Sequence, residues 1–343
     1  MRAVVVDRPG VARLSQLAVP EPVAGEIAVS VAAAGICGSD VEILRGTRPA
    51  AFVRYPVVPG HEWAGAVVAV GPGVRGINVG DRVVAEGFRS CGVCERCREG
   101  RTNLCSSEYA ETGFTHQGAF AESLCVPARL AHRLPADVDL EAAALLEPAA
   151  CVAGGLLEAP LRPGLRIAVV GAGTLGLLAV SMLRLTSPDR LALVGTRKAR
   201  LALGRQLGAG ETYDVDAESV DSLRDTFDLV FEAANRPTGA ATALTLARRG
   251  GTVILEGITG ADDSALNGDI ITLKHLEVRG IFGASGAAWT YAVQLFAGGR
   301  LPLSELISHR FALEDFQSAF ATLEDRDSGA VKVQLLPLVH SQA

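Results

Sequence analysis

Two kinds of hydrophobic pattern follow one another along the chain. In the N-terminal part, apolar residues alternate with small or polar residues in segments such as EIAVSVAAAG (residues 26–35) and AGAVVAVG (residues 64–71), a pattern that predicts strands. From about residue 148, short apolar runs such as FDLVFEAA (residues 227–234) alternate with helical patterns, which is typical of a doubly wound parallel sheet. The sequence therefore predicts an α/β protein with a β-rich N-terminal part and a parallel-sheet domain over residues 148–283.

A glycine-rich turn follows the first strand of the predicted parallel sheet. The segment LRIAVVGAGTLGLLAVSML contains a buried strand, a turn with Gly171, Gly173 and Gly176, and an apolar helix. In this context the first glycine permits a tight turn, the second lets a pyrophosphate approach the backbone, and the helix N-terminus stabilises the charge of the pyrophosphate. Thr174 and Leu175 complete the start of the helix. We therefore predict that a dinucleotide cofactor binds at this turn.

The end of the next strand indicates which dinucleotide binds. An NAD site places a carboxylate about twenty residues after the glycine turn, where it accepts the ribose hydroxyls, whereas the strand RLALVG ends at Gly195. The residues that follow offer donors and positive charge: Thr196, Arg197, Lys198 and Arg200. An arginine pairs with a 2′-phosphate that a carboxylate would repel. We predict NADP rather than NAD; in the alternative, Arg197 and Lys198 only begin a solvated helix.

Four of the seven cysteines lie between residues 89 and 106. They are Cys91, Cys94, Cys97 and Cys105. Their spacing, C-x2-C-x2-C-x7-C, would bring four sulfurs to one zinc ion, and four thiolates leave no open coordination position, so such a site is structural. The alternatives are two disulfides or an iron–sulfur cluster. The N-terminal apolar run is too short for a signal-peptide core, which predicts a cytoplasmic protein with reduced thiols and favours zinc.

The cysteine spacing follows GICGSD and PGHEWAG and precedes GAGTLG. With these segments in this order, the chain resembles the zinc-containing medium-chain alcohol and polyol (sorbitol-like) dehydrogenases over essentially its whole length. The resemblance implies a GroES-like catalytic domain at residues 1–147 with the zinc lobe at 89–106, a dinucleotide-binding Rossmann domain at 148–283, and a return to the catalytic domain at 284–343. It also implies one structural zinc, one catalytic zinc, and a homodimer or homotetramer.

Three segments match those that supply the catalytic zinc ligands of this family: GICGSD with Cys37, GHEWAG with His61, and LLEPAA with Glu147. Taken singly, a buried cysteine is more often core filler, a histidine in a turn is seldom a ligand, and a glutamate at a helix start usually caps the helix. Together, the resemblance implies that they hold a zinc whose fourth position is open. Glu62 matches an acid that approaches the metal transiently. Ser39 matches a hydroxyl that relays the substrate proton, although it would also suit a helix N-cap.

Charge and composition favour a small-molecule substrate. The 32 basic and 38 acidic residues give a net charge of -6 without a basic block, which argues against nucleic acid or an anionic membrane as a partner. The longest apolar run is broken by Arg184 and is too short to cross a membrane. We therefore predict hydride transfer between a secondary alcohol (polyol, sugar or cyclitol-like) and NADP, interconverting alcohol and ketone. The alternatives are a zinc-binding member of the fold without dehydrogenase activity and a quinone or enoyl reductase.

Two places depart from the pattern of the family. Glu42 stands where a relay histidine is common, and Gly283 and Ala284 stand where sorbitol-type enzymes carry an arginine near the polyol. These changes argue against sorbitol itself and leave room for a ring-shaped or amino-substituted secondary alcohol. Trp289 and Phe52 are candidate walls of the pocket, although either aromatic would equally serve as a core residue.

Overall fold

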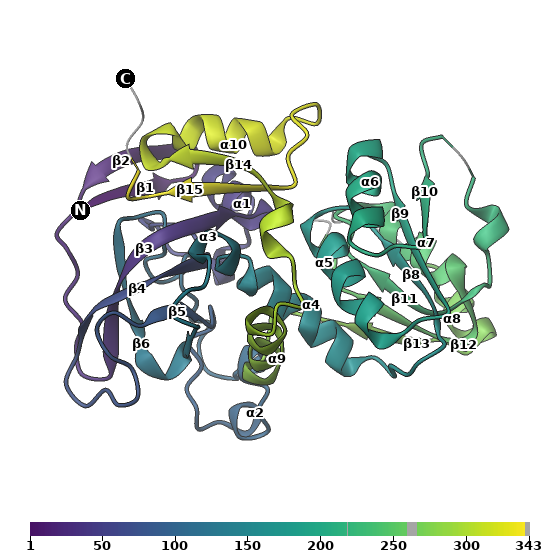
Figure 1. Cartoon of the computed structure of the whole chain (residues 1–343), viewed down its shortest axis with the longest axis horizontal. Coiled ribbons are helices and arrows are strands. Elements are labelled where there is room, and N and C mark those ends of the chain that lie inside the picture. The colour runs from purple at the N-terminus through teal and green to yellow at the C-terminus, as the bar shows by residue number, and fades with distance from the viewer. Residues whose placement is uncertain (218, 259–265, 340–343) are drawn as a thin grey trace. The chain divides into compact units, whose positions relative to one another are not determined.

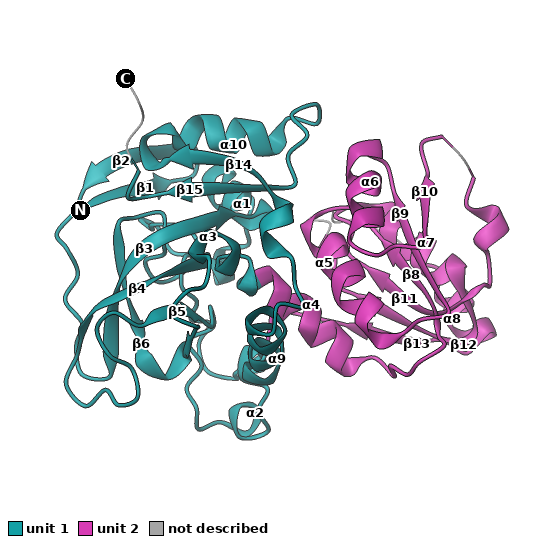
Figure 2. Cartoon of the chain, in the orientation of Figure 1, with its two compact units in different colours: residues 1–147, 285–343 teal, residues 148–284 magenta. Residues whose placement is uncertain are grey.

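The computed structural model describes residues 1–217, 219–258 and 266–339 (Figure 1). The chain divides into two compact units: unit 1 comprises residues 1–147 and 285–343, and unit 2 comprises residues 148–284 (Figure 2). Each unit is built around its own sheet. Over the described residues, no helix has both the length and the apolar character needed to cross a bilayer.

Unit 2 contains a six-stranded sheet in the order β10-β9-β8-β11-β12-β13, in which every pair of neighbours is parallel. The strands are β8 (Arg166–Val170), β9 (Arg190–Gly195), β10 (Glu211–Asp214), β11 (Phe227–Glu232), β12 (Ala247–Leu255) and β13 (Glu277–Gly280). The helices are α5 (Thr174–Leu183), α6 (Lys198–Gln206), α7 (Pro237–Leu246), α8 (Gly268–Lys274) and most of α4 (Leu146–Glu158). Because crossover helices cover both faces of a parallel sheet, the central strands are apolar on both sides. The predicted doubly wound sheet is confirmed.

Unit 1 contains a seven-stranded sheet in the order β14-β15-β3-β4-β5-β7, with β6 also paired to β3, and a separate pair β1-β2. The strands are β1 (Arg2–Arg8), β2 (Val11–Gln16), β3 (Glu26–Ile36), β4 (Glu62–Val70), β5 (Arg82–Ala85), β6 (Ser123–Pro127), β7 (Ala131–Arg133), β14 (Ile307–Ala312) and β15 (Lys332–Leu336). The helices are α1 (Gly38–Arg45), α2 (Glu95–Arg98), α3 (Leu140–Ala143), α9 (Gly286–Ala297) and α10 (Phe316–Glu324). The β-rich architecture expected of the N-terminal part is confirmed.

The pairing of β3 with β4 brings two of the predicted metal ligands together. The strands are antiparallel, and Gly35 is the partner of Glu62. Cys37 directly follows β3 and His61 directly precedes β4, so both residues lie at the same end of the strand pair. A Cβ atom on Gly35 would lie 2.2 Å from Oε2 of Glu62, so glycine at this position leaves the space that the carboxylate occupies.

Helix α1 begins directly after Cys37, which is its N-cap. The backbone N–H of Cys37 donates to Oδ2 of Asp40 at 2.8 Å. The helix start is therefore capped by an acid three residues after the N-cap residue. Ser39 lies inside the first turn. The interpretation of Ser39 as an N-cap is therefore wrong, because the helix begins before the segment DVEILRG that the sequence pattern indicated.

Candidate active site and metal centres

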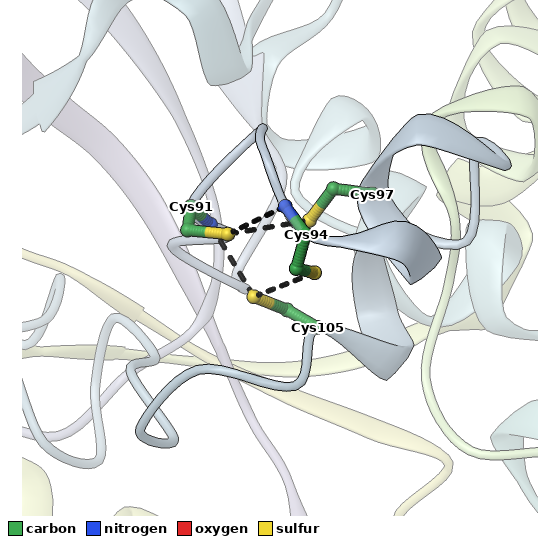
Figure 3. Close-up of side chains that lie close together, drawn as sticks. All are labelled: Cys91, Cys94, Cys97 and Cys105. Carbon is green, nitrogen blue, oxygen red and sulfur yellow. Dashed lines mark hydrogen bonds between the residues drawn. The ribbon is translucent and has the colours of Figure 1, made fainter.

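The four cysteines of the lobe converge on one point in unit 1 (Figure 3). Sγ of Cys91 lies 4.0 Å from Sγ of Cys97. The Sγ atoms of Cys94 and Cys105 are 3.9 Å apart. A tetrahedral zinc with zinc–sulfur bonds of about 2.3 Å requires sulfur–sulfur distances of about 3.8 Å, so the cluster fits the ion that the spacing predicts. The structure holds all four as free thiols rather than disulfides.

Hydrogen bonds in the lobe favour the thiolates that zinc requires. The backbone N–H of Cys94 donates to Sγ of Cys91 at 3.3 Å (Figure 3). Hydrogen bonds from Ser106 lower the pKa of Cys94 to about 5. Burial instead raises the pKa of Cys97 to about 12. A dication among the sulfurs would displace that last proton, because coordinating thiols are deprotonated.

A second group of ligand atoms lies in the same unit. One atom each from Cys37, His61 and Glu62 all lie within 4.8 Å of one another. His61 and Glu62 are buried, and Cys37 is half-buried. Thiolate, imidazole and carboxylate are all zinc ligands, and a set of three leaves the fourth position of a tetrahedral ion open. This donor set fits a catalytic zinc.

Asp40 binds the backbone of Cys37 and faces the imidazole of His61, although it was not among the predicted site residues. It is fully buried, and its Oδ1 accepts the N–H of Gly60 at 3.2 Å. The same oxygen lies 3.6 Å from Nδ1 of His61, which leaves Nε2 for a metal. Its Oδ2 binds the backbone N–H of Cys37. The signal was present in GICGSD, because an acid three residues after an N-cap residue is placed to bind the backbone of that residue.

The electrostatics of this group favour a cation. Burial acts to lower the pKa of His61, but the charge of Asp40 and hydrogen bonds with Asp40 and Cys37 outweigh it. With a further contribution from the charge of Glu147, the pKa of His61 is raised well above its ordinary value. The negative groups that hold a proton on the imidazole would equally hold a metal cation in its place, since a metal ligand must be neutral imidazole.

Glu62 is paired with a residue from the far end of the chain. Lys332, the first residue of β15, donates to both carboxylate oxygens of Glu62 at 2.8 and 2.6 Å and to the carbonyl of Ile36 at 3.2 Å. Both side chains of the ion pair are at most 4% exposed. Sheet pairing of β15 with β3 places Lys332 there. Glu62 therefore lies beside the metal centre with its negative charge already balanced.

Glu147 lies in the first turn of α4, in agreement with the helix start expected at this glutamate. It is not part of the three-atom group found in the described residues. Its charge nevertheless contributes, against the effect of burial, to raising the pKa of both His61 and Lys332, so it lies close to the centre. Glu62 is already paired with Lys332, so Glu147 is the carboxylate that is more available to bind the metal. Its role as a ligand stays a proposal.

An aromatic and charged wall lies beside His61. The ring of His61 contacts that of Phe114, with centroids 4.8 Å apart, and the guanidinium of Arg48 lies over the Phe114 ring at 4.2 Å. Nε of Arg48 also donates to the carbonyl of Phe52 at 3.4 Å. Arg48 pairs with Glu42 at 3.2 Å. The acid at the usual position of the relay histidine is thus engaged in an ion pair.

Trp289, Gly283 and Ala284, which the sequence analysis named for the substrate pocket, do not belong to this wall beside His61. Trp289 is 2% exposed and stacks on His132, with centroids 5.6 Å apart, so it is a core residue of unit 1. In unit 2, Gly283 has a φ of 60° and Ala284 is buried. Neither Gly283 nor Ala284 offers a polar group from its side chain.

The predicted glycine turn of unit 2 joins β8 to α5. Gly171 has a φ of 109°, which favours glycine, and a Cβ atom on Gly176 would lie 1.7 Å from the carbonyl oxygen of Gly171. Gly173 is the N-cap of α5, and nothing lies within 4 Å of the position of its Cβ. Thr174 and Leu175 form the first turn. The turn thus leaves space in front of a helix N-terminus, as pyrophosphate binding requires.

Positive charge follows the end of β9. The strand ends at Gly195, Thr196 follows, and Arg197 is the N-cap of α6, which begins at Lys198. Burial, together with the neighbouring charge of Arg197, lowers the pKa of Arg200 to about 10. Two guanidinium groups therefore lie close enough to repel one another. An anionic phosphate between them would relieve this repulsion.

Comparisons with known proteins extend over both units. Residues 23–136 match the Alcohol dehydrogenase GroES-like domain, and residues 147–335 match the Glucose dehydrogenase C-terminus. An L-threonine 3-dehydrogenase of Paraburkholderia phymatum is 32% identical over 325 residues, which cover 93% of this chain and 94% of that protein. The chain belongs to the zinc-containing medium-chain alcohol and polyol dehydrogenases.

Solved structures of similar proteins cover nearly the whole dehydrogenase. A Sinorhizobium meliloti 1021 protein bound to NADP has a TM-score of 0.92 at 30% identity, with 98% of this chain and 99% of that chain covered. An Escherichia coli CFT073 alcohol dehydrogenase complexed with NADH has a TM-score of 0.89 at 28% identity, with 98% and 99% covered. The expected GroES-like and Rossmann folds are confirmed. The protein is a zinc-dependent alcohol dehydrogenase for small-molecule substrates that uses NAD or NADP.

Proposed function

We propose that this dehydrogenase transfers a hydride between a secondary alcohol of polyol, sugar or cyclitol type and NADP, interconverting the alcohol and the ketone. The observation that carries the proposal is the meeting of Cys37, His61 and a carboxylate at one largely buried point of unit 1. Zinc held there would supply Lewis-acid polarisation of the substrate oxygen, and NADP would accept the hydride. The similarity to an L-threonine 3-dehydrogenase supports a secondary alcohol, because threonine carries its hydroxyl on a secondary carbon.

In this proposal, residues of unit 1 have different roles in the reaction. Cys37, His61 and Glu147 would hold the metal, and the carboxylate of Asp40, 3.6 Å from Nδ1 of His61, would favour the imidazole orientation that leaves Nε2 for it. Ser39, half-buried in the first turn of α1, would relay the proton of the substrate hydroxyl, taking it up as it gives its own hydroxyl proton to solvent. The burial of His61 and Glu62 excludes water from one side of the site, which strengthens the electrostatic interactions there.

The activity is tested directly with zinc-loaded protein and a pooled panel of secondary alcohols, polyols, amino alcohols and cyclitols. Formation of reduced nicotinamide is followed with NADP and with NAD in parallel. We expect a signal with NADP that disappears on chelation and returns with zinc. Subdividing the pool then identifies the substrate.

The zinc content separates the proposal from its alternatives. A catalytic centre and a lobe together bind two zincs per chain, whereas a quinone or enoyl reductase needs no catalytic metal and would keep only the zinc of the lobe. A protein with two zincs that oxidises no alcohol in the panel would favour a zinc-binding member without dehydrogenase activity.

The preference for NADP depends on Arg197 in this proposal. The substitution Arg197→Asp replaces a charge that pairs with the 2′-phosphate by one that repels it. We expect the ratio of kcat/KM with NADP to kcat/KM with NAD to fall by at least about 10-fold, the effect of losing one charge-assisted hydrogen bond. The two values are measured on the same alcohol.

Arg205→Asp is the matched control for this experiment. It makes the same change of charge in the last turn of α6, where the guanidinium donates to Oγ1 of Thr212 at 2.8 Å. We expect it to leave the cofactor ratio unchanged. If Arg197→Asp also left the ratio unchanged, the assignment of NADP would be wrong.

We also propose a cytoplasmic homodimer or homotetramer. A reducing compartment keeps the seven cysteines as thiols, and none of the seven forms a disulfide in the structure. β13 forms one edge of the six-stranded sheet in the described residues, and an open edge is a ready site for pairing with a second copy. Light scattering on the purified protein tests this, and a monomer at micromolar concentration would contradict it.

A further inference from the structure

An open groove with a volume of about 470 Å³ lies in unit 1. Three segments form it: the loop between β4 and β5, residues 128–133, which include β7, and one side of α9 (Figure 1). None of the residues that line it belongs to either group of metal-ligand residues. Its volume lies in the range of small-molecule pockets, so it is large enough for a ligand that the proposed reaction does not use.

Both residues of permanent charge in the groove are arginines, Arg75 and Arg133. Within the described residues, the guanidinium of Arg75 has no ion-pair or hydrogen-bond partner. Arg133 pairs only loosely with Asp81, since its Nη1 lies 4.0 Å from Oδ2 and its side chain is 59% exposed. No aspartate or glutamate is among the described residues that line the groove. An anion between the two guanidinium groups would therefore relieve their mutual repulsion.

The rest of the lining is largely apolar and lies deeper than the arginines. Ile77 is buried, Val293 of α9 is half-buried, and two alanines of residues 128–133 are half-buried as well, whereas Arg75 and Arg133 are exposed. Gln294 adds an exposed side-chain amide on the same side of α9. A charged rim above an apolar base suits a ligand that has an anionic end and an apolar body.

His132 gives the groove a fixed wall. Its ring stacks on that of Trp289, with centroids 5.6 Å apart, and its Nε2 lies 3.3 Å from Oε1 of Glu86. The hydroxyl of Thr102 donates to Oε2 of Glu86 at 3.5 Å and accepts the N–H of Gly286, the first residue of α9, at 3.3 Å. These contacts connect β7 to α9 without any ligand. The groove is thus preformed, which lowers the cost of binding.

We infer that this groove binds a small phosphorylated molecule with an apolar or aromatic body, at a site separate from the reaction. A phosphate monoester carries between one and two negative charges at pH 7. Its oxygens match the planar donor groups of Arg75 and Arg133, and its body would cover Ile77 and Val293. A carboxylate has a single charge and would satisfy one arginine only. The inference does not depend on the proposed dehydrogenase activity.

Phenyl phosphate, benzoate, phenol and inorganic phosphate are the probes that test the inference. Each is titrated by calorimetry into zinc-loaded protein saturated with NADPH, so that the cofactor site is already occupied. We expect a Kd of about 1 mM for phenyl phosphate. The other three should bind at least about 10-fold more weakly, because benzoate lacks the second charge, phenol lacks any charge and inorganic phosphate lacks the apolar body.

Two substitutions locate the binding in the groove. Arg75→Gln and Arg133→Gln each remove one charge and keep a polar side chain, and each should raise the Kd of phenyl phosphate about 10-fold, the effect of one charge-assisted hydrogen bond. Arg326→Gln makes the same change at an exposed arginine of unit 1 outside the groove, and it should leave the Kd unchanged. All three positions are exposed, so the variants should fold, and circular dichroism verifies this.

Three results would overturn the inference. The first is no saturable binding of phenyl phosphate up to about 10 mM. The second is a Kd that is unchanged in both Arg75→Gln and Arg133→Gln. The third is inorganic phosphate or benzoate that binds as tightly as phenyl phosphate, since the groove would then recognise neither the apolar body nor the second charge. Alcohol oxidation is not measured, so the result is independent of the proposed function.

Discussion

Lys332 and Asp40 show how single residues outside the ligand set determine the metal centre. Asp40 binds the backbone on both sides of the centre, at Cys37 and Gly60. Lys332 binds both oxygens of Glu62. Each buried charge in this cluster has a partner, as the cost of burying an unpaired charge requires. The centre therefore contains fixed negative charge for a cation and one acid that is already neutralised.

The substitution Lys332→Met tests the importance of this pairing. It leaves the carboxylate of Glu62 buried without a counter-charge, and we expect a loss of about 3–5 kcal/mol in the free energy of unfolding at pH 7. Both tryptophans of the chain, Trp63 and Trp289, belong to unit 1, so tryptophan fluorescence during urea unfolding reports on this unit.

The double variant Lys332→Met with Glu62→Gln serves as the control for that experiment. It removes both charges, so most of the lost stability should return. If the double variant were as unstable as the single variant, the loss would come from packing around the lysine stem and not from the unpaired acid.

At the scale of elements, Asp228 of β11 connects three neighbouring strands of unit 2. Its Oδ2 accepts the backbone N–H of Arg166 at 2.8 Å and Nε of the same residue at 3.2 Å, at the start of β8. Nε of Arg248, in β12, donates to Oδ1. Burial acts to raise the pKa of Asp228, but these hydrogen bonds outweigh it and lower the pKa to about 2. The carboxylate therefore stabilises the sheet only in its charged form.

We expect Asp228→Asn to cost about 1 kcal/mol at pH 7, a figure reduced for the water that screens the two half-exposed arginines. Because the pKa is lowered on folding, the contribution of Asp228 is complete above the unfolded-state pKa of about 4 and is lost as the pH falls towards 2. Thermal unfolding of both proteins at pH 7 and pH 3 measures the difference, which should narrow at pH 3. Asp327→Asn, at an exposed side chain, should show no effect at either pH. An equal difference at both pH values would contradict an ionic contribution.

The elements of unit 2 could be predicted because local sequence specifies each of them. The strand before Gly171, the turn and the helix after it are each determined by neighbouring residues, and the structure confirms them. The start of α1 was predicted less well, because the N-cap depends on a hydrogen bond between Cys37 and Asp40 rather than on the hydroxyl of Ser39. Boundaries thus follow from bonds that the hydrophobic pattern does not record.

The site could be predicted only where its residues lie in short motifs. Cys37 and His61 carry a local signal, and the pairing of β3 with β4 brings them together. Lys332 is 270 residues from Glu62, and only the position of β15 in the sheet makes them partners. The roles of Ser39 and Glu147, and the contacts to NADP, stay predictions.

At the scale of the whole molecule, metal and cofactor binding are assigned to different units. The residues of both metal centres belong to unit 1, whereas the glycine turn and Arg197 belong to unit 2. Each unit has its own cluster of buried apolar residues, one built around β3 and one around β11. Since each unit buries its own core, a change at a site in one unit should leave the other unit folded.

This division predicts that the catalytic zinc and NADPH binding can be separated. Cys37→Ser removes a thiolate ligand but keeps a good N-cap for α1, so the variant should fold with the lobe zinc alone. We expect alcohol oxidation to fall by at least about 100-fold, because Lewis-acid stabilisation is worth several kcal/mol. The Kd of NADPH, measured by its fluorescence, should stay within about twofold of the wild-type value, since the turn at α5 is unchanged. Arg197→Asp should have the opposite effect: the variant should keep two zincs per chain but bind NADPH more weakly. Loss of NADPH binding together with the catalytic zinc would mean that unit 2 does not by itself provide the affinity for the cofactor.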